Sequence, residues 1–508
     1  MKGLIPGGLA TTLLAALLVV MPLHAETQDY AALRSIPAQL QVSFENVAID
    51  ADEQMGLFGA HYLFQTHPNG YLGVSGYGAV TGQRGGFFTG GFTLAAQWPL
   101  APRWWLDGSM FVGGGGGGSA PQGSGLMLRP QLGVSRELAN LRLGVGLSQV
   151  RFPDGAIDSR QLNVYLGMPF DWRYAHAADA GRQVSADDLR GLAWGEGEWQ
   201  ATLAEYRPRA GASTTEGTPM QSLRRVGVEY RSYLDSGAYL MIESGGAMSG
   251  DADGFAEILA GMGYRRPLTS RLGMSAALSA GGAGGGRVDT DGGLVAKARI
   301  GMDYHLGPAA KLGVDLGRMQ SAGSFAADFY GINLAYRLGG LRSAVPGRAW
   351  SGERLPQLRK WRLVAIEHRQ PNAARKNIQA MDLGLYGLKI DKFLDDNMYM
   401  TGQAYGAYHG GAGGYAVGLL GAGWEQSLNA SGRLRAHVEL TAGAAGGGGI
   451  DVGGGAILQP MLGLSWRLDH QFGLRLETGR VRAVNGELDS ALWGLGLSYE
   501  FSRAERAY

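Results

Sequence analysis

The 508-residue chain contains no cysteine. This excludes disulfide bonds, cysteine–metal sites and a thiol nucleophile. The chain also has no excess of charge of either sign, because 45 Lys and Arg residues face 44 Asp and Glu residues. A nucleic-acid-binding protein usually carries a clear basic excess, so the composition does not indicate a nucleic-acid partner.

Long hydrophobic runs are missing beyond the first 25 residues. A membrane-spanning helix needs about 20 consecutive apolar residues, so any membrane span in the rest of the chain must consist of strands. The N-terminus itself has Lys2, an apolar run from Leu13 to Leu23 and a small residue at Ala25. This order is typical of a cleavable secretory signal peptide, which we predict over residues 1–25.

Glycine, in contrast, is abundant: 86 of the 508 residues are glycine. Three runs are prominent, GGGGGG at 113–118, GGAGGG at 281–286 and GGGG at 446–449. Glycine is the residue with the most backbone freedom to lose on ordering. We therefore expect these runs to form flexible loops at the extracellular ends of hairpins.

Three copies of one unit fill the mature chain. RPQLGVSREL at Arg129 returns as KARIGMDYHL at Lys297 and as QPMLGLSWRL at Gln459. The closing segments NVYLGMPF, GINLAYRL and GLGLSYEF begin at residues 163, 331 and 494. The predicted boundaries are unit 1 at 26–170, a periplasmic linker at 171–198, unit 2 at 199–338, a second periplasmic linker at 339–360, unit 3 at 361–501 and a tail at 502–508.

Hydrophobic residues alternate within each unit, which predicts strands with one apolar and one polar face. In RLRAHVELTAG, for example, Val438 and Leu440 alternate with His437 and Glu439. Each unit divides into about eight such strands. In the first unit the strands are predicted to start near Leu40, Gly56, Tyr71, Phe87, Arg103, Gly125, Leu141 and Arg160.

Connections between the predicted strands alternate between short turns, such as QTHPNG, and longer glycine-rich loops. Several aromatic residues cluster beside the short turns, as in an interfacial girdle: Trp98, Trp104, Trp105, Tyr264, Trp424 and Trp466. Together with the signal peptide and the terminal strand GLGLSYEF, these features resemble the bacterial outer-membrane β-barrel class. The resemblance implies an all-β transmembrane barrel in the cell outer membrane, with lipids and the barrel assembly machinery as partners.

Two architectures fit this pattern. One barrel of about 24 strands is the favoured prediction, because a repeated hairpin block extends a sheet without new closing edges. The alternative is three tandem eight-stranded barrels. A soluble glycine-rich β-protein would alternate in the same way, but the nearly charge-free aliphatic faces favour the membrane barrel.

If aliphatic side chains face lipid, the opposite parity lines the interior. The predicted pore-lining residues are Arg129, Gln131, Glu243, Lys297, Arg299, Asp303, Asp315, Arg435, Glu439, Arg475 and Glu477. Glu45, Glu205 and Glu367 recur in the first strand of each unit and are predicted to lie at the rim.

This mixed-charge lumen predicts a pore or secretion conduit for a hydrophilic polymer, peptide or solute. Periplasmic export components are expected as further partners of a secretion conduit. A structural or adhesive surface protein is the alternative function. We predict no enzyme, since His437 and Glu439 share a face without a recognisable nucleophile motif, and we predict no metal site and no cofactor.

Overall fold

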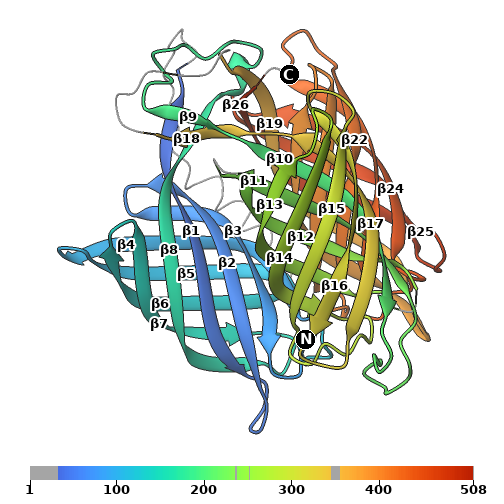
Figure 1. The fold of residues 1–508 in the computed structure, drawn as a ribbon. Coiled ribbons are helices and arrows are strands. Elements are labelled where there is room, and N and C mark those ends of the chain that lie inside the picture. The colour runs from blue at the N-terminus through green and yellow to red at the C-terminus, as the bar shows by residue number, and fades with distance from the viewer. Residues whose placement is uncertain (1–31, 235–236, 251, 345–349, 351–354, 507–508) are drawn as a thin grey trace.

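The computed structural model describes residues 32–234, 237–250, 252–344, 350 and 355–506. The described chain forms antiparallel strands and one short 3-10 helix, η1 (Ala177–Asp179). Figure 1 shows the strands gathered into three barrels, with the first and second at the front and the third behind. The predicted signal peptide, residues 1–25, lies outside the described residues.

Barrel 1 contains eight strands that close on themselves. They are β1 (Arg34–Ala48), β2 (Gln54–His67), β3 (Gly70–Thr81), β4 (Phe88–Ala101), β5 (Trp104–Gly116), β6 (Met127–Leu138), β7 (Leu141–Arg151) and β8 (Asp158–His176). β1 pairs with β2 on one side and with β8 on the other, with Val42 opposite Leu166. The first and last strands therefore form the closing seam.

Barrel 2 repeats this arrangement after the first linker. Its strands are β10 (Gly197–Pro208), β11 (Leu223–Tyr233), β12 (Ala238–Ser249), β13 (Ala256–Pro267), β14 (Leu272–Gly284), β15 (Leu294–His305), β16 (Ala310–Ser321) and β17 (Ala326–Arg337). The seam joins β10 to β17, with Leu203 opposite Ile332.

Barrel 3 follows the second linker. Its strands are β19 (Gln357–Arg375), β20 (Ile378–Phe393), β21 (Met398–His409), β22 (Ala416–Ser427), β23 (Leu434–Gly446), β24 (Ala456–Arg467), β25 (Phe472–Ala483) and β26 (Asp489–Glu505). The seam joins β19 to β26, with Leu363 opposite Tyr499.

The favoured prediction of one 24-stranded barrel is wrong, and the alternative of three eight-stranded barrels describes the strand pairing. β8 pairs with β7 on one edge and with β1 on the other. It therefore has no free edge on which β10 could extend the sheet. Among the described strands, the strand pairing between barrels 1 and 3 is limited to two residue pairs, in which His176 and Ala175 lie opposite Phe501 and Ser502.

The described parts of the segments between the barrels include a small sheet at the short-turn end, at the top of Figure 1. There β9 (Leu192–Gly195) pairs with β18 (Gly340–Ser343). Strand β8 continues to His176 and β10 begins at Gly197, so the first linker is shorter than the predicted 171–198.

The predicted tail at 502–508 also needs correction. β26 continues to Glu505, where it pairs with Gln357. Trp361 Nε1 donates a hydrogen bond of 2.7 Å to Glu505 Oε1, which fixes this end of the strand. The part of the predicted tail at 507–508 lies outside the described residues.

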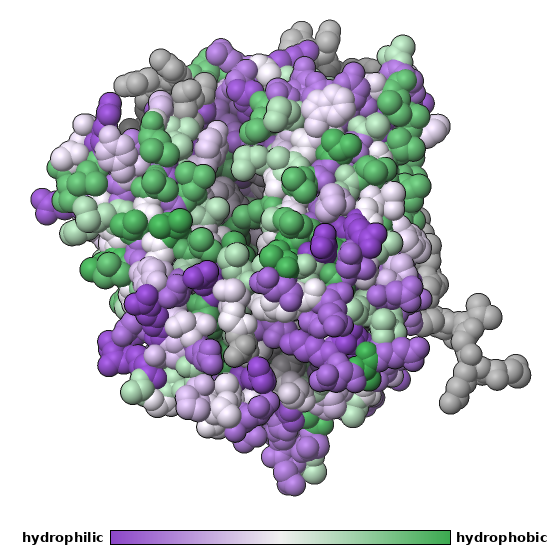
Figure 2. All heavy atoms as spheres, turned by 90° about the vertical axis from the view of Figure 1, so that its right-hand side faces the viewer, coloured by the Kyte–Doolittle hydropathy of each residue, from purple (hydrophilic) through white to green (hydrophobic). Residues whose placement is uncertain are grey.

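The outer walls of the barrels are apolar. Leu162 is 69% exposed, Met262 66% and Leu440 62%, although such residues are normally buried in a soluble protein. Figure 2 shows hydrophobic residues gathered across the middle of the wall and hydrophilic residues below them, at the loop end. Five members of the predicted aromatic girdle are exposed on this wall, whereas Trp105 is only partly exposed and stacks against Arg142.

The glycine runs do not form flexible loops, and that expectation is wrong. β5, β14 and β23 end within the three runs, and Gly113–Gly116 are all buried. β5 packs on β21 of barrel 3, β14 on β3 of barrel 1, and β23 on β12 of barrel 2. The fifth strand of each barrel therefore contacts the third strand of another, which closes a ring of three barrels.

The reason for glycine at these contacts is the closeness of the backbones. A Cβ added at Gly114 would lie 2.8 Å from the carbonyl oxygens of both Gly406 and Ala407. A Cβ at Gly446 would lie 2.2 Å from the backbone nitrogen of Gly254. Any side chain at these positions would separate the barrels, so glycine is required by packing.

Candidate functional site: the barrel interiors

The loop end of each barrel is closed by apolar side chains from its loops. In barrel 1, Phe87, Phe152 and Ile157 lie between strands and pack into a buried cluster with Val47 and Met127. The matching loop residues are Phe255, Val288 and Phe325 in barrel 2 and Tyr415, Ile450, Val452 and Leu488 in barrel 3. Each barrel thus has an apolar core between its loop end and its polar interior.

Barrel 3 has a fully buried charged cluster behind this apolar layer. Lys389 Nζ lies 2.9 Å from Glu439 Oε1 and 3.0 Å from Glu477 Oε2. His368 Nε2 lies 2.9 Å from Glu477 Oε1, and Arg475 Nη2 lies 3.6 Å from Glu477 Oε2. All five side chains have no exposed surface, so their charges are compensated by one another and not by water.

A second charged layer of barrel 3 lies toward the short-turn end. Arg362 Nε donates to Asp391 Oδ2 at 2.8 Å and also forms an ion pair with Glu425. Arg435 Nη1 contacts Glu425 Oε1 at 2.6 Å. A cavity of about 410 Å³ opens here, lined by Lys360, Glu425 and Arg435 together with residues of η1 and the β20–β21 turn.

Barrel 2 contains a comparable network. Lys297 Nζ lies 2.9 Å from Glu243 Oε2 and 3.2 Å from Glu257 Oε1. Arg299 Nη2 contacts Glu229 Oε1 at 2.5 Å. The remaining predicted residues of this barrel also have partners: Asp315 accepts a hydrogen bond of 2.6 Å from Asn333, and Asp303 contacts Arg265 at 2.5 Å.

Barrel 1 is filled mainly by neutral polar groups. Its ion pair joins Arg129 Nε to Glu45 Oε1 at 2.6 Å, and Arg129 Nη1 donates to Gln131 Oε1 at 2.7 Å. Glu45 was predicted at the rim but is 2% exposed inside the barrel, because its parity follows Ser43 and not the outward-facing Phe44 and Asn46. Glu205 and Glu367 are partly exposed, and both have the outward parity of their strands.

All eleven predicted pore-lining residues lie inside a barrel, but they are divided among three separate interiors. Arg129 and Gln131 lie in barrel 1, and the four residues from Arg435 to Glu477 lie in barrel 3. The wide common lumen is therefore absent from the described chain. The sequence analysis missed several partners of these residues: Glu229, Glu257, Arg225, Arg362, His368, Lys389, Asp391 and Glu425. Their inward parity was readable, as Lys389 lies between Leu388 and Ile390.

One arrangement in barrel 3 has the order of a nucleophile, a base and an acid. Ser465 Oγ lies 3.5 Å from His437 Nδ1, and His437 Nε2 lies 3.6 Å from Glu477 Oε2. Both distances are at or beyond the limit of a hydrogen bond. His437 is 2% exposed, so a substrate has no access to the imidazole. Among the described residues, no three acidic or histidine side chains form a group that could hold a metal ion.

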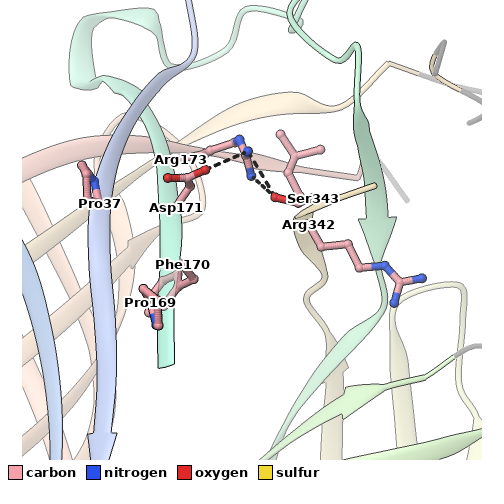
Figure 3. Close-up of a pocket in the computed structure, with 8 residues that line it drawn as sticks. Pro37, Pro169, Phe170, Asp171, Arg173, Arg342 and Ser343 are labelled. Carbon is pink, nitrogen blue, oxygen red and sulfur yellow. Dashed lines mark hydrogen bonds and ion pairs between the residues drawn. The ribbon is translucent and has the colours of Figure 1, made fainter. Parts of the chain in front are cut away.

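A cavity of about 630 Å³ separates barrel 1 from the linker strand β18 (Figure 3). Pro37, Pro169 and Phe170 form its barrel side. Arg173 bridges the gap, because its guanidinium lies 3.6 Å from Asp171 and donates to Ser343 Oγ at 3.3 Å. This contact ties the first barrel to the linker sheet.

In the described chain, no helix is long and apolar enough to cross a membrane. Comparison with protein-family models finds no match, and no curated protein matches the chain. The similar solved structures include the ferric enterobactin receptor PfeA of Pseudomonas aeruginosa, with a TM-score of 0.28 and 11% identity over 94% of this chain and 82% of that one.

Two further solved structures are also similar, and one of them, OpdK, is an outer-membrane protein. OpdK of Pseudomonas aeruginosa has a TM-score of 0.22 and 12% identity over 92% of this chain and 98% of that one. OccAB3 of Acinetobacter baumannii has a TM-score of 0.20 and 11% identity over 93% and 99%. These scores are too low to transfer a function. The closed barrels and their apolar walls confirm the predicted class, a β-barrel protein of the bacterial outer membrane.

Proposed function

We propose that the protein is a non-conducting structural protein of the outer membrane, in which three filled barrels form one rigid ring. The observation that carries this proposal is the filling of the interiors. The interior of an eight-stranded barrel is narrow enough for its own side chains to fill it. Here those side chains are paired charges such as Lys389 with Glu477, followed by an apolar cluster at the loop end.

An ion crossing barrel 3 would have to displace these groups. Breaking a buried ion pair leaves an uncompensated charge, which costs several kcal/mol. The apolar residues Tyr415, Ile450 and Leu488 offer no ligands that could replace the hydration shell of the ion. These interior groups would therefore stabilise the barrel and oppose the passage of ions.

The shape of the loop end favours a structural role over adhesion. The longest connection at this end is the β10–β11 loop, residues 209–222, and the other loops are shorter. Apolar residues of the loops, such as Phe87 and Phe325, are buried inside the barrels. Little chain is left to form an exposed adhesive surface.

Electrical recording in planar lipid bilayers tests the proposal. Folded protein, verified by heat-modifiable migration on gels, is expected to insert without producing channels. A protein with the same barrels but an open path would give stable single-channel currents. Regular conductance steps from the unaltered protein would contradict the proposal directly.

Solute transport across the outer membrane is the second candidate function. The cavity of about 410 Å³ favours it, because Lys360, Glu425 and Arg435 there give a polar mouth to barrel 3. Passage of a peptide or hydrophilic polymer would require the charged layers and the loop cluster to move aside. Swelling of proteoliposomes in small sugars distinguishes this candidate: uptake supports transport, and its absence supports the structural role.

The structural proposal also includes two expectations from the sequence, which concern enzymatic activity and partners. Under this proposal the protein has no enzymatic activity, and the burial of His437 beside Ser465 supports that expectation. Its expected partners are then membrane lipids and the barrel assembly machinery. Periplasmic export components would be partners only under the transport candidate.

A further inference from the structure

The loop end of barrel 2 carries a cluster of arginines on its outer wall. We call Arg207, Arg209, Arg224 and Arg318, with the carboxylates Glu205 and Asp328, the arginine patch. The four arginine side chains are 45–64% exposed. They project from a barrel wall that is otherwise apolar. Contact with the acyl chains of lipids would therefore not account for arginines at these positions.

The patch is continuous across four neighbouring strands. Arg318 on β16 lies opposite Asp328 on β17, and Asp328 lies opposite Arg207 on β10. In the next row, Glu205 on β10 lies opposite Arg224 on β11 and Tyr330 on β17. Neighbouring strands are about 4.8 Å apart, so these groups form one surface.

The patch begins where the lipid-facing wall ends. Arg318 follows Leu316 by two residues and therefore points outward like this leucine, which is 55% exposed. Arg207 points outward like Leu203, which lies four residues earlier on β10. On β17, the exposed Ile332 follows Tyr330 by two residues, toward the middle of the wall. In a barrel that spans a membrane, the end of the apolar band is the level at which lipid headgroups meet the wall.

The two carboxylates hold the arginines in place. Glu205 Oε1 lies 3.1 Å from Arg207 Nε, and Glu205 Oε2 lies 3.5 Å from Arg224 Nε. Asp328 lies 2.8 Å from Arg318 Nε. Arginines 224 and 318 both make these contacts through Nε. A guanidinium used in this way still has two terminal nitrogens that can donate to a second anion.

Tyr330 and Arg209 complete the surface. Arg207 Nη2 donates to Tyr330 Oη at 2.9 Å, and the guanidinium of Arg207 lies 4.7 Å from the centre of the Tyr330 ring. Arg209 Nη1 contacts Asp328 at 3.3 Å. These contacts order the patch before a ligand binds, which lowers the entropy that binding would cost.

The charge of the patch exceeds that of the matching places on the other barrels. Four arginines and two carboxylates give a net charge of +2 on barrel 2. Barrel 1 has Arg151, Arg160 and Asp158 at this level, which gives +1. Barrel 3 has Arg369, Arg480 and Arg482 with Glu367 and Asp489, which also gives +1. Barrel 2 is therefore the side of the ring best suited to an anion.

We propose that the arginine patch binds the phosphate groups of a phosphorylated lipid in the leaflet at the loop end. Guanidinium groups match phosphate oxygens in shape and charge, and several arginines beside an apolar wall can bind headgroup and acyl chain together. The site goes beyond the proposed function, because it requires only that barrel 2 lies in the membrane and not that any barrel is closed to ions.

The test uses the full-length protein in phosphatidylcholine nanodiscs, titrated with lipid A that carries two phosphates. The R224Q/R318Q variant is expected to bind at least tenfold more weakly than the unaltered protein. The matched control is R266Q/R271Q, which removes two exposed arginines from the short-turn end of the same barrel. This control is expected to change binding less than twofold.

Two further arms identify the source of the phosphate. Lipid A stripped of its phosphates should bind the unaltered protein at least tenfold more weakly, and millimolar inorganic phosphate should not displace bound lipid A. Equal binding by R224Q/R318Q and the unaltered protein would overturn the proposal. Displacement by inorganic phosphate at that concentration would overturn its lipid part. Because salt screens charge pairs, binding by the unaltered protein should weaken as NaCl rises, and a salt-independent affinity would also count against the patch.

Discussion

Barrels 1 and 3 have the same strand number and the same closed topology, but their interiors differ in chemistry. Barrel 3 is filled by buried ions, among them Lys389, Glu439 and Arg475. Barrel 1 is filled mostly by hydroxyl, amide and imidazole groups, as in the chain Ser43–His61–Ser75–Thr93. The same closed fold therefore accommodates interiors of different chemistry, as long as side chains fill them, and it does not require a particular set of charges.

This difference bears on function. A conduit needs charges along a continuous path, and such a path should be similar in repeated units that perform the same task. Here one interior is nearly neutral and another is densely ionic, while the apolar cluster at the loop end is present in both. The feature that the two barrels share is closure, which agrees with a structural role.

The largest effect is expected from removing one charge of barrel 3. Arg475→Met leaves Asp391, Glu439 and Glu477 with less compensation, and loss of one partner from a buried ionic group typically costs about 3–5 kcal/mol. Hydrogen exchange measured at increasing urea should show that all strands of barrel 3 lose protection at a lower urea concentration, while barrel 1 stays protected. Arg480→Met, on the outer face of the same strand, should leave this profile unchanged. Equal effects of the two variants would mean that the buried network does not stabilise barrel 3.

A smaller effect is expected at the contact between the two barrels. Gly114→Ala places a Cβ against the backbone of Gly406 and Ala407, and such overpacking costs about 1–3 kcal/mol. Hydrogen exchange should increase in both β5 and β21. Gly90→Ala is the matched control, because a Cβ at Gly90, opposite Gly114 on β4, meets nothing within 4 Å. If both variants behave alike, the glycine run does not serve barrel packing.

The smallest effect is expected in the neutral interior of barrel 1. Ser75→Ala removes the hydrogen bonds of Ser75 to His61 Nδ1 and Thr93 Oγ1, at about 1 kcal/mol for each bond. The urea midpoint of barrel 1 should fall by less than that of barrel 3 in Arg475→Met. A loss as large as that of Arg475→Met would remove the distinction between the two interiors.

Much of the local structure was readable from the sequence. Starts predicted near Gly56, Tyr71 and Leu141 agree with observed starts at Gln54, Gly70 and Leu141. The inward parity of Arg475 and Glu477 also followed, because a strand alternates its faces with a period of two. These features depend on neighbouring residues only.

Closure and pairing depend on distant residues, which the alternation does not encode. β8 has the same pattern whether it pairs with β1 or with another strand, so the sequence could not decide between one barrel and three. Gly90 and Gly114 are both glycines and lie opposite each other on β4 and β5, but of the two only Gly114 packs against the backbone of barrel 3. The partners of Glu477 were missed for the same reason, since Lys389 and His368 are 88 and 109 residues away.

The most direct test of three closed barrels is a cross-link at the seam of barrel 1. The chain has no cysteine, and Val42 lies opposite Leu166 across β1 and β8. Opposed residues on antiparallel strands are close enough for a disulfide. After oxidation of V42C/L166C in the outer membrane, mass spectrometry should find one peptide pair joined by a disulfide. V42C/L147C, with the second cysteine on β7, should stay reduced. Free thiols in folded V42C/L166C would show that β8 does not return to β1, and would contradict the account.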